Sequence, residues 1–225
     1  MMIGLYLLLN LGVLWLVARA AAAASGWRLM AMLFLLSFVV GSANSMVEAV
    51  FFRVLSVQQA LAAGIPALII MAILSPLAVL LAGRWRKGAE APSAIGRFTP
   101  LTLLAAVVAY EVLYWSAGTL VFPYVQHFYA GQELPGRHAV AAMQVARSLI
   151  FVGAAYPLLK SGLRSAPLML ALVYSVIGGV APLLPDNPYM PPDIRFYHGI
   201  EVSVSNFIFG LVVGYLFSRG RRAQA

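Results

Sequence analysis

The sequence predicts an all-α membrane protein, a bundle of seven transmembrane helices. Hydrophobic residues make up 62% of the 225-residue chain and charged residues only 10%, and the mean hydropathy is +0.90. A typical soluble domain is about 45–50% apolar and about 25% charged, so this composition excludes a water-soluble globule. It excludes intrinsic disorder for the same reason. Seven spans with short loops account for nearly all of residues 1–225, which we expect to form a single integral membrane domain.

The first three spans are predicted from long apolar runs, because about 20 such residues cross a bilayer as a helix. The first span covers about residues 2–18 and ends before Arg19. The second covers about residues 29–52. The third covers about residues 64–82 and is followed by a basic cluster at residues 84–87.

The other four spans are separated by segments rich in proline, glycine or charge. They cover about residues 99–122, 139–159, 167–184 and 192–217. Pro192 suits the first turn of the last span, because proline lacks an N–H that this turn leaves unused. Two further segments, Phe122–Tyr129 and Pro185–Pro192, would cover one end of the bundle, either as an aromatic belt with a rigid turn or as a lid.

The distribution of basic residues predicts the orientation of the bundle. Eleven of the 15 Lys and Arg residues lie in the first, third and fifth loops and the C-terminal tail, whereas three lie on the opposite side. Because Lys and Arg are enriched in cytoplasmic loops, we expect the N-terminus outside the plasma membrane and the C-terminus in the cytoplasm. The net charge of +8 then reflects topology beside anionic lipid, and nucleic acid is not an expected partner.

Polar residues inside the spans predict the candidate site, because ionisable groups are costly in hydrocarbon and usually face a protein interior. The candidates for binding a solute or carrying protons are Glu48, Glu111, Arg147, His198 and Glu201. Supporting polar groups are expected at Asn44, Gln144, Ser205 and Asn206. At about 1.5 Å per residue, the three glutamates and the arginine lie about 6 to 16 Å below the outer ends of their spans. The sequence therefore predicts a polar pocket that opens outward and is closed toward the cytoplasm.

Two spacing patterns predict how particular helix faces are used. In the second span, α-helical spacing predicts a single stripe formed by Ser37, Gly41, Asn44 and Glu48. In the last span, small residues predict a face for close packing against a neighbouring span or, alternatively, a second copy of the chain: Gly199, Ser203, Asn206, Gly210 and Gly214.

Arg147 is the one basic residue inside a span, and its guanidinium cannot lose its proton. It therefore needs a carboxylate or an anionic ligand. The estimated depths of Glu201 and Glu111 bracket that of Arg147. Glu201, about one helical turn away in depth, is the expected partner.

Other interpretations of these polar residues stay open. One glutamate paired with Arg147 could simply hold the helices together, helped by amide hydrogen bonds. A metal site is not expected, because di-metal bundles carry Glu-x-x-His on two helices and this chain has one reversed pair, His198 and Glu201. No cofactor is expected, since the chain has no cysteine and its lysines lie at span ends. No catalytic residue can be assigned.

Together these patterns favour a protein that binds or translocates a small polar or protonatable solute. Three glutamates against one arginine leave carboxyl groups that could carry protons. The alternatives are an intramembrane enzyme acting on a lipid or lipid-linked substrate, and a non-catalytic accessory or assembly subunit, with the balance against an enzyme. The expected partners are the lipid bilayer, the solute or a lipid, and, as an open alternative, a second copy of the chain.

Overall fold

The computed structural model describes residues 2–86, 98–131, 133–186 and 189–218. The fold is all-helical, with 83% helix and no strand in the described ranges. Seven helical stretches are long and apolar enough to cross a membrane. The predicted fold class is confirmed to this extent, and each predicted span corresponds to one of these stretches.

The elements follow the predicted order along the chain. The first span is α1 (Met2–Ala20), and the second is α2 (Gly26–Phe38), the π-helical η1 (Val39–Ala43) and α3 (Asn44–Phe51). The third is α4 (Val57–Leu81), the fourth is α5 (Pro100–Val125) with the 3₁₀ turn η2 (Gln126–Tyr129), and the fifth is α6 (Arg137–Lys160). The sixth is α7 (Ala166–Leu172), the π-helical η3 (Val173–Val180) and the 3₁₀ turn η4 (Ala181–Leu183), and the seventh is α8 (Pro192–Ser218).

Two boundaries differ from the sequence prediction. The third span begins at Val57 because Ser56 and Gln59 form a capping box, in which each side chain accepts a hydrogen bond from the other's main-chain N–H. The fourth span continues through Pro123 to Val125, where a loop was predicted. Pro123 lies in the last turn of this helix, so its missing N–H removes a single hydrogen bond and does not end the helix.

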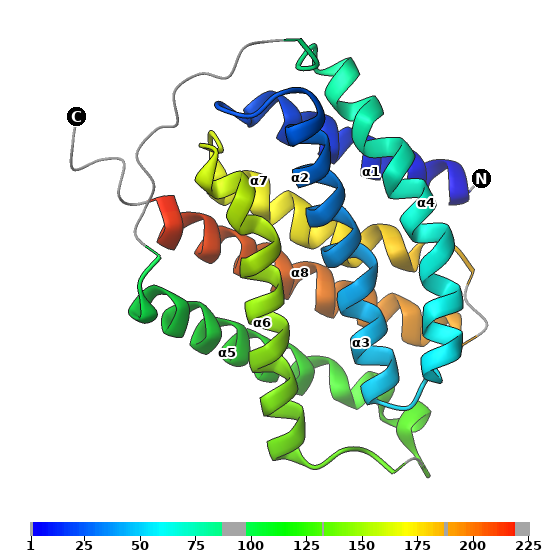
Figure 1. Cartoon of the computed structure of the whole chain (residues 1–225). Coiled ribbons are helices and arrows are strands. Elements are labelled where there is room, and N and C mark those ends of the chain that lie inside the picture. Colours follow the sequence, from blue (N-terminus) through cyan, green and yellow to red (C-terminus); the bar gives the residue numbers. More distant parts are fainter. Residues whose placement is uncertain (1, 87–97, 132, 187–188, 219–225) are drawn as a thin grey trace.

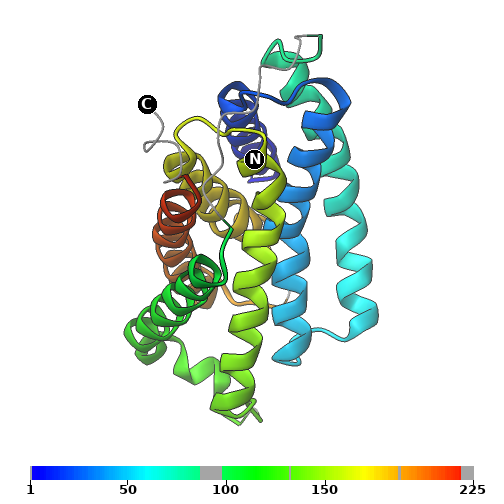
Figure 2. The ribbon, with the colours of Figure 1, turned by 60° about the vertical axis from the view of Figure 1, so that its left-hand side comes forward.

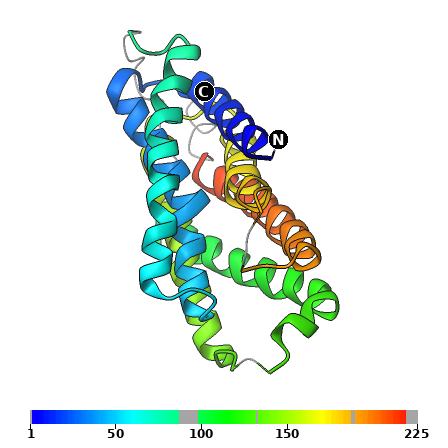
Figure 3. The ribbon, with the colours of Figure 1, turned by 90° about the vertical axis from the view of Figure 1, so that its right-hand side faces the viewer.

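The helices are arranged in two layers inclined to one another (Figure 1). One layer holds α4, the α2–α3 span and α6, and the other holds α1, the α7–η3 span, α8 and α5. Figure 2 and Figure 3 show the same two layers from the side. Contacts of α1 with α4 and of α5 with α6 join the layers at their edges, so the seven spans form a closed ring.

The predicted small-residue face of the last span is confirmed as a packing surface within the chain. A Cβ on Gly210 would lie 2.5 Å from the main chain of Ala171, and one on Gly214 would collide with Cα of Pro167. Only glycine permits this approach, because the two helix backbones are almost in contact. The partner of this face is therefore α7.

The second span contradicts the predicted single stripe. The N–H of Asn44 donates to the carbonyl oxygen of Val39, five residues back, so a π turn interrupts the α-helical spacing. Gly41 packs against Ile177, whereas Asn44 and Glu48 point to Arg147.

The end of the bundle formed by residues 20–26, 82–86 and 161–166, called here the closed end, is held by main-chain hydrogen bonds. They run from Ala22 N to Gly162 O and from Ala23 N to Ser161 O, both 2.9 Å. The Arg84 side chain adds three more, because its Nη2 donates to the carbonyl oxygens of Ala21, Ala22 and Ala24. This arginine is 7% exposed, and its Nε has no hydrogen-bond partner among the described residues, so Nη2 alone joins the side chain to the loop.

The opposite end, formed by the loops that follow α3, η2 and η4 and called here the open end, is held by exposed ion pairs. Arg53 Nη1 lies 3.5 Å from Glu133 Oε2, and His127 Nε2 lies 3.2 Å from Asp193 Oδ2. Such pairs contribute little to stability, because water screens them.

Candidate functional site

Arg147, in α6, is the centre of a buried polar cluster. Its Nη1 donates to Glu48 Oε1 at 2.6 Å and to Gln144 Oε1 at 3.1 Å. Its Nε donates to Asn44 Oδ1 at 3.2 Å, and the Tyr110 ring lies 5.9 Å from the guanidinium carbon. The Arg147 side chain is only 5% exposed. A buried ion pair is tolerated when further hydrogen bonds satisfy its remaining groups. Asn44 and Gln144 supply two such bonds, while Gln144 Nε2 is buried without a partner among the described residues.

The expected pairing of Arg147 with Glu201 is wrong, because the carboxylate partner is Glu48. The prediction compared depths along straight, parallel helices. In the structure the α8 layer is inclined to the layer that holds α3 and α6, so equal depth along two helices does not bring their side chains together (Figure 1). The π turn of η1 further changes which residues of the second span face α6.

Glu201 and His198 form a second pair, within α8. His198 Nδ1 lies 3.2 Å from Glu201 Oε2, and the two side chains are 27% and 17% exposed. The other carboxylate oxygen of Glu201 faces α5, where a Cβ on Gly118 would lie 3.5 Å from it. The predicted supporting residue Ser205 donates to the main-chain oxygen of Glu201 at 2.7 Å, so its bond is local to the helix.

Two tyrosines connect the clusters. Tyr114, in α5, lies within electrostatic range of Glu48, Arg147 and Glu201. Tyr129, in η2, lies within range of both Glu48 and Glu201. Neither tyrosine was among the predicted site residues.

The remaining predicted residues are placed elsewhere. Glu111 accepts a hydrogen bond from Trp115 Nε1 at 2.9 Å through one carboxylate oxygen, and its other oxygen is buried without a partner. Asn206 is 4% exposed, lies beside Gly178 and has an unpartnered Nδ2. Neither residue contacts Arg147, so the structure gathers part of the predicted set and leaves these two outside.

A layer of four buried aromatic rings closes the polar cluster on the side away from the open end. It consists of Tyr110, Phe151, Tyr174 and Phe209, which come from α5, α6, η3 and α8 and are each at most 5% exposed. Their ring centroids lie 4.7 to 5.9 Å apart. The hydroxyl of Tyr174 donates to the carbonyl oxygen of Phe151, which satisfies the polar end of a fully buried ring.

Sequence reasoning missed most of this layer, although Tyr110 carries a detectable signal. Tyr110 precedes Tyr114 by four residues, so the two rings lie on one face of α5. Phe151 follows Arg147 by four residues, so α-helical spacing places it on the same face of α6. Tyr174 gave no signal, because its position depends on a π segment that apolar spacing does not reveal.

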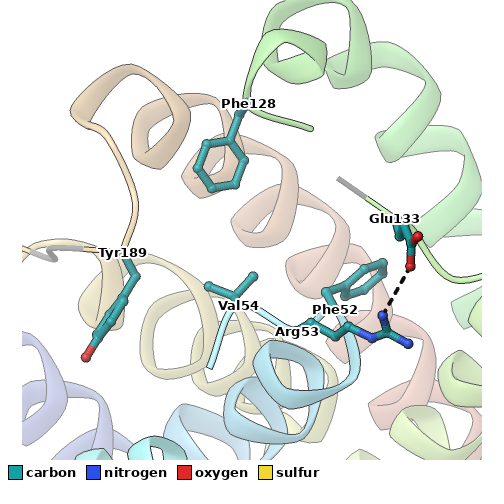
Figure 4. Close-up of a pocket in the computed structure, with 6 residues that line it drawn as sticks. All are labelled: Phe52, Arg53, Val54, Phe128, Glu133 and Tyr189. Atoms are coloured by element: carbon teal, nitrogen blue, oxygen red, sulfur yellow. Dashed lines mark ion pairs between the residues drawn. The ribbon is translucent and has the colours of Figure 1, made fainter. Parts of the chain in front are cut away.

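A pocket of about 390 Å³ lies at the open end. Its lining residues are Phe52, Arg53, Val54, Phe128, Glu133 and Tyr189. Figure 4 shows the Arg53–Glu133 ion pair on one side and Tyr189 on the opposite side. None of the predicted site residues lines this pocket, but Glu48 lies one helical turn before Phe52 and is partly exposed. Phe128 and Tyr189 come from the two segments expected to cover this end.

In the described ranges, no three His, Asp or Glu side chains come together as metal ligands. The polar groups that are brought together are suited to hydrogen bonding and proton exchange. Comparisons of the chain with known protein families, with curated proteins and with solved structures found no match.

Proposed function

We propose that this chain is a plasma-membrane protein that binds or translocates a small polar or protonatable solute. The N-terminus and the open end face outward, and the closed end and the C-terminus face the cytoplasm. The support for this orientation is the excess of Lys and Arg on the loops of the closed end.

The observation that carries the functional proposal is the position of the polar cluster. It lies between the open end, where Glu48, His198 and Glu201 are partly exposed, and a layer of packed aromatic rings. A polar cluster that only held helices together would not need side chains exposed toward the open end. In the described ranges no arginine neutralises Glu201 or Glu111. These two ionisable groups are not needed for a contact that only holds helices together.

We assign different roles to the residues of the cluster. Glu48 already neutralises the charge of Arg147. This ion pair can separate when a charged solute competes for either of the two side chains. Glu201, hydrogen-bonded to His198, is the group that exchanges protons with the open end. Glu111 follows Tyr110 in α5, so it lies at the level of the aromatic layer, outside the Arg147 cluster, and would receive protons from Glu201.

Reconstitution in proteoliposomes with an internal pH dye tests this function. A panel of small amines, carboxylic acids and amino acids is added outside, and at least one is expected to drive proton uptake. Glu201→Gln should abolish the signal, whereas Glu133→Gln should retain it, because Glu133 is 93% exposed and lies outside the cluster. Turnover of a lipid without flux would favour an enzyme instead, and copurification with a fixed partner would favour an accessory subunit.

Reporter fusions test the orientation independently. A reporter after Ala225 should be active in the cytoplasm, and tags at Gly131 or Asn187 should be accessible from outside. External labelling of a cysteine placed at Gly88 would reverse the assignment. The absence of native cysteines makes such labelling free of background. Asn187, Gly88 and Ala225 lie outside the described residues.

A further inference from the structure

Two spans contain π-helical segments, η1 and η3. At the end of η1, the N–H of Asn44 donates to Val39 O, and at the end of η3, the N–H of Ala181 donates to Val176 O, five residues back in each case. π-helical turns are rare and are found mostly at functional sites. Here the first of them directly precedes Asn44 and Glu48, the two residues of this span that bind Arg147.

The two segments interlock. A Cβ on Gly41 of η1 would lie 2.9 Å from Cγ2 of Ile177, and one on Gly178 of η3 would lie 2.9 Å from Cγ1 of Val40. Each glycine therefore receives the branched side chain of the opposite segment. Because the fit is reciprocal, a change of helical form in one segment must displace the other.

The contact region also leaves buried polar atoms unpaired. Ser203 Oγ and Asn206 Nδ2 have no hydrogen-bond partner within the described ranges, and both lie against the glycines of η3. A Cβ on Gly179 would lie 2.7 Å from this Ser203 oxygen. Unpaired buried groups are rare in native proteins. These two lie where α8 packs against η3.

A π turn holds one residue more than an α turn, and each residue of an α-helix corresponds to about 100° of rotation. If η1 becomes α-helical, α3 therefore turns by about 100° relative to α2. Val47 then takes the direction that Glu48 has now, toward α6. Val47 is 45% exposed in the present structure, so the two arrangements differ clearly at this side chain.

We propose that η1 is a register switch for the Arg147 cluster. In the engaged register, which the structure shows, Asn44 and Glu48 bind Arg147. In the released register η1 is α-helical, Val47 packs toward α6, and the guanidinium and the Glu48 carboxylate are separated and available to other partners. The switch is a property of the chain alone, so its test requires no solute and stands or falls separately from the proposed transport.

A nitroxide label at Val47→Cys detects the switch in proteoliposomes, because the native chain has no cysteine. The expected spectrum of the parent is a mobile component from the engaged register, and an immobilised component marks the released register. The matched control is Leu35→Cys, which is 43% exposed and precedes η1 in the same span. It should give one component. Two components at both positions would indicate general heterogeneity of the bundle and overturn the proposal.

Two variants shift the expected populations in opposite directions. Glu48→Gln removes the charge that holds the engaged register, and an immobilised component should appear at residue 47. Deleting Ala43 removes the extra residue, so α2 and α3 join as one α-helix with Asn44 and Glu48 still directed at Arg147, and residue 47 should stay mobile even when Glu48→Gln is added. If the deletion does not fold, Glu48→Gln decides alone. A single mobile component at residue 47 in both the parent and Glu48→Gln would overturn the register switch.

Discussion

The two ends of the bundle are joined by different kinds of contact. At the closed end, main-chain hydrogen bonds link three loops, and the buried Arg84 donates to three carbonyl oxygens of one of them. At the open end, ion pairs such as Arg53–Glu133 join the loops through side chains that are 77% and 93% exposed. Buried hydrogen bonds to a charged group are costly to lose, whereas exposed ion pairs are worth little. The closed end is therefore held more strongly than the Arg53–Glu133 contact of the open end, although Arg195 Nη1 also donates to Pro185 O at that end.

The largest expected effect lies in the half of the bundle toward the open end. Arg147→Ala should lower the free energy of unfolding by about 3–5 kcal/mol, because it leaves the Glu48 carboxylate buried without its partner. Adding Glu48→Ala should recover part of this loss. The measurement is a double-mutant cycle in detergent, with Arg147→Ala and Glu201→Ala as the matched control pair that should be close to additive. Additive behaviour of the Glu48 pair would contradict the assigned contact.

The seam between α7 and α8 provides the corresponding test in the half toward the closed end. Gly210→Leu should lower the free energy of unfolding by about 3 kcal/mol, because a side chain there must push two backbones apart. Leu211→Ala, at the next position, should have a smaller effect. Thermal melting in detergent compares the two, and equal melting temperatures for Gly210→Leu and the parent would refute the seam.

Arg84 tests the rigidity of the closed end directly. Arg84→Ala should cost about 2–3 kcal/mol, because three carbonyl oxygens lose a charged donor. Arg86→Ala is the control, since this neighbouring residue is exposed. Amide hydrogen exchange should show faster opening of residues 20–26 in Arg84→Ala alone. Unchanged protection in that loop would mean that the main-chain bonds hold the closed end without the arginine.

The smallest effect is expected at the open end. Arg53→Ala removes an exposed ion pair and should change the free energy of unfolding by less than about 0.5 kcal/mol. The same melting experiment measures it beside Arg84→Ala. A loss at Arg53 as large as that at Arg84 would abolish the proposed difference between the two ends.

The spans could be predicted because bilayer thickness sets a length and a composition that the sequence displays directly. The polar residues of the candidate site could be predicted for a similar reason, since charge inside an apolar run is visible without a structure. The carboxylate partner of Arg147 could not be predicted from the sequence. It depends on the inclination of the two layers and on the π turn of η1, neither of which follows from α-helical spacing. Arg84 was predicted only as part of a basic cluster, because its burial depends on a loop about 60 residues away.

The aromatic layer has a consequence for the response of this protein to membrane voltage. In the proposed orientation, water that reached the partly exposed side chains through the open end would carry the outside potential inward, whereas the packed rings would insulate. Most of the voltage would then fall across the layer and the half of the bundle below it. Moving one charge through the full potential is worth about 2.3 kcal/mol per 100 mV. Proton exchange at Glu201 should therefore be nearly independent of voltage. A charge that passes Tyr110 and Phe209 should cross almost the whole membrane potential, so its movement should depend strongly on voltage.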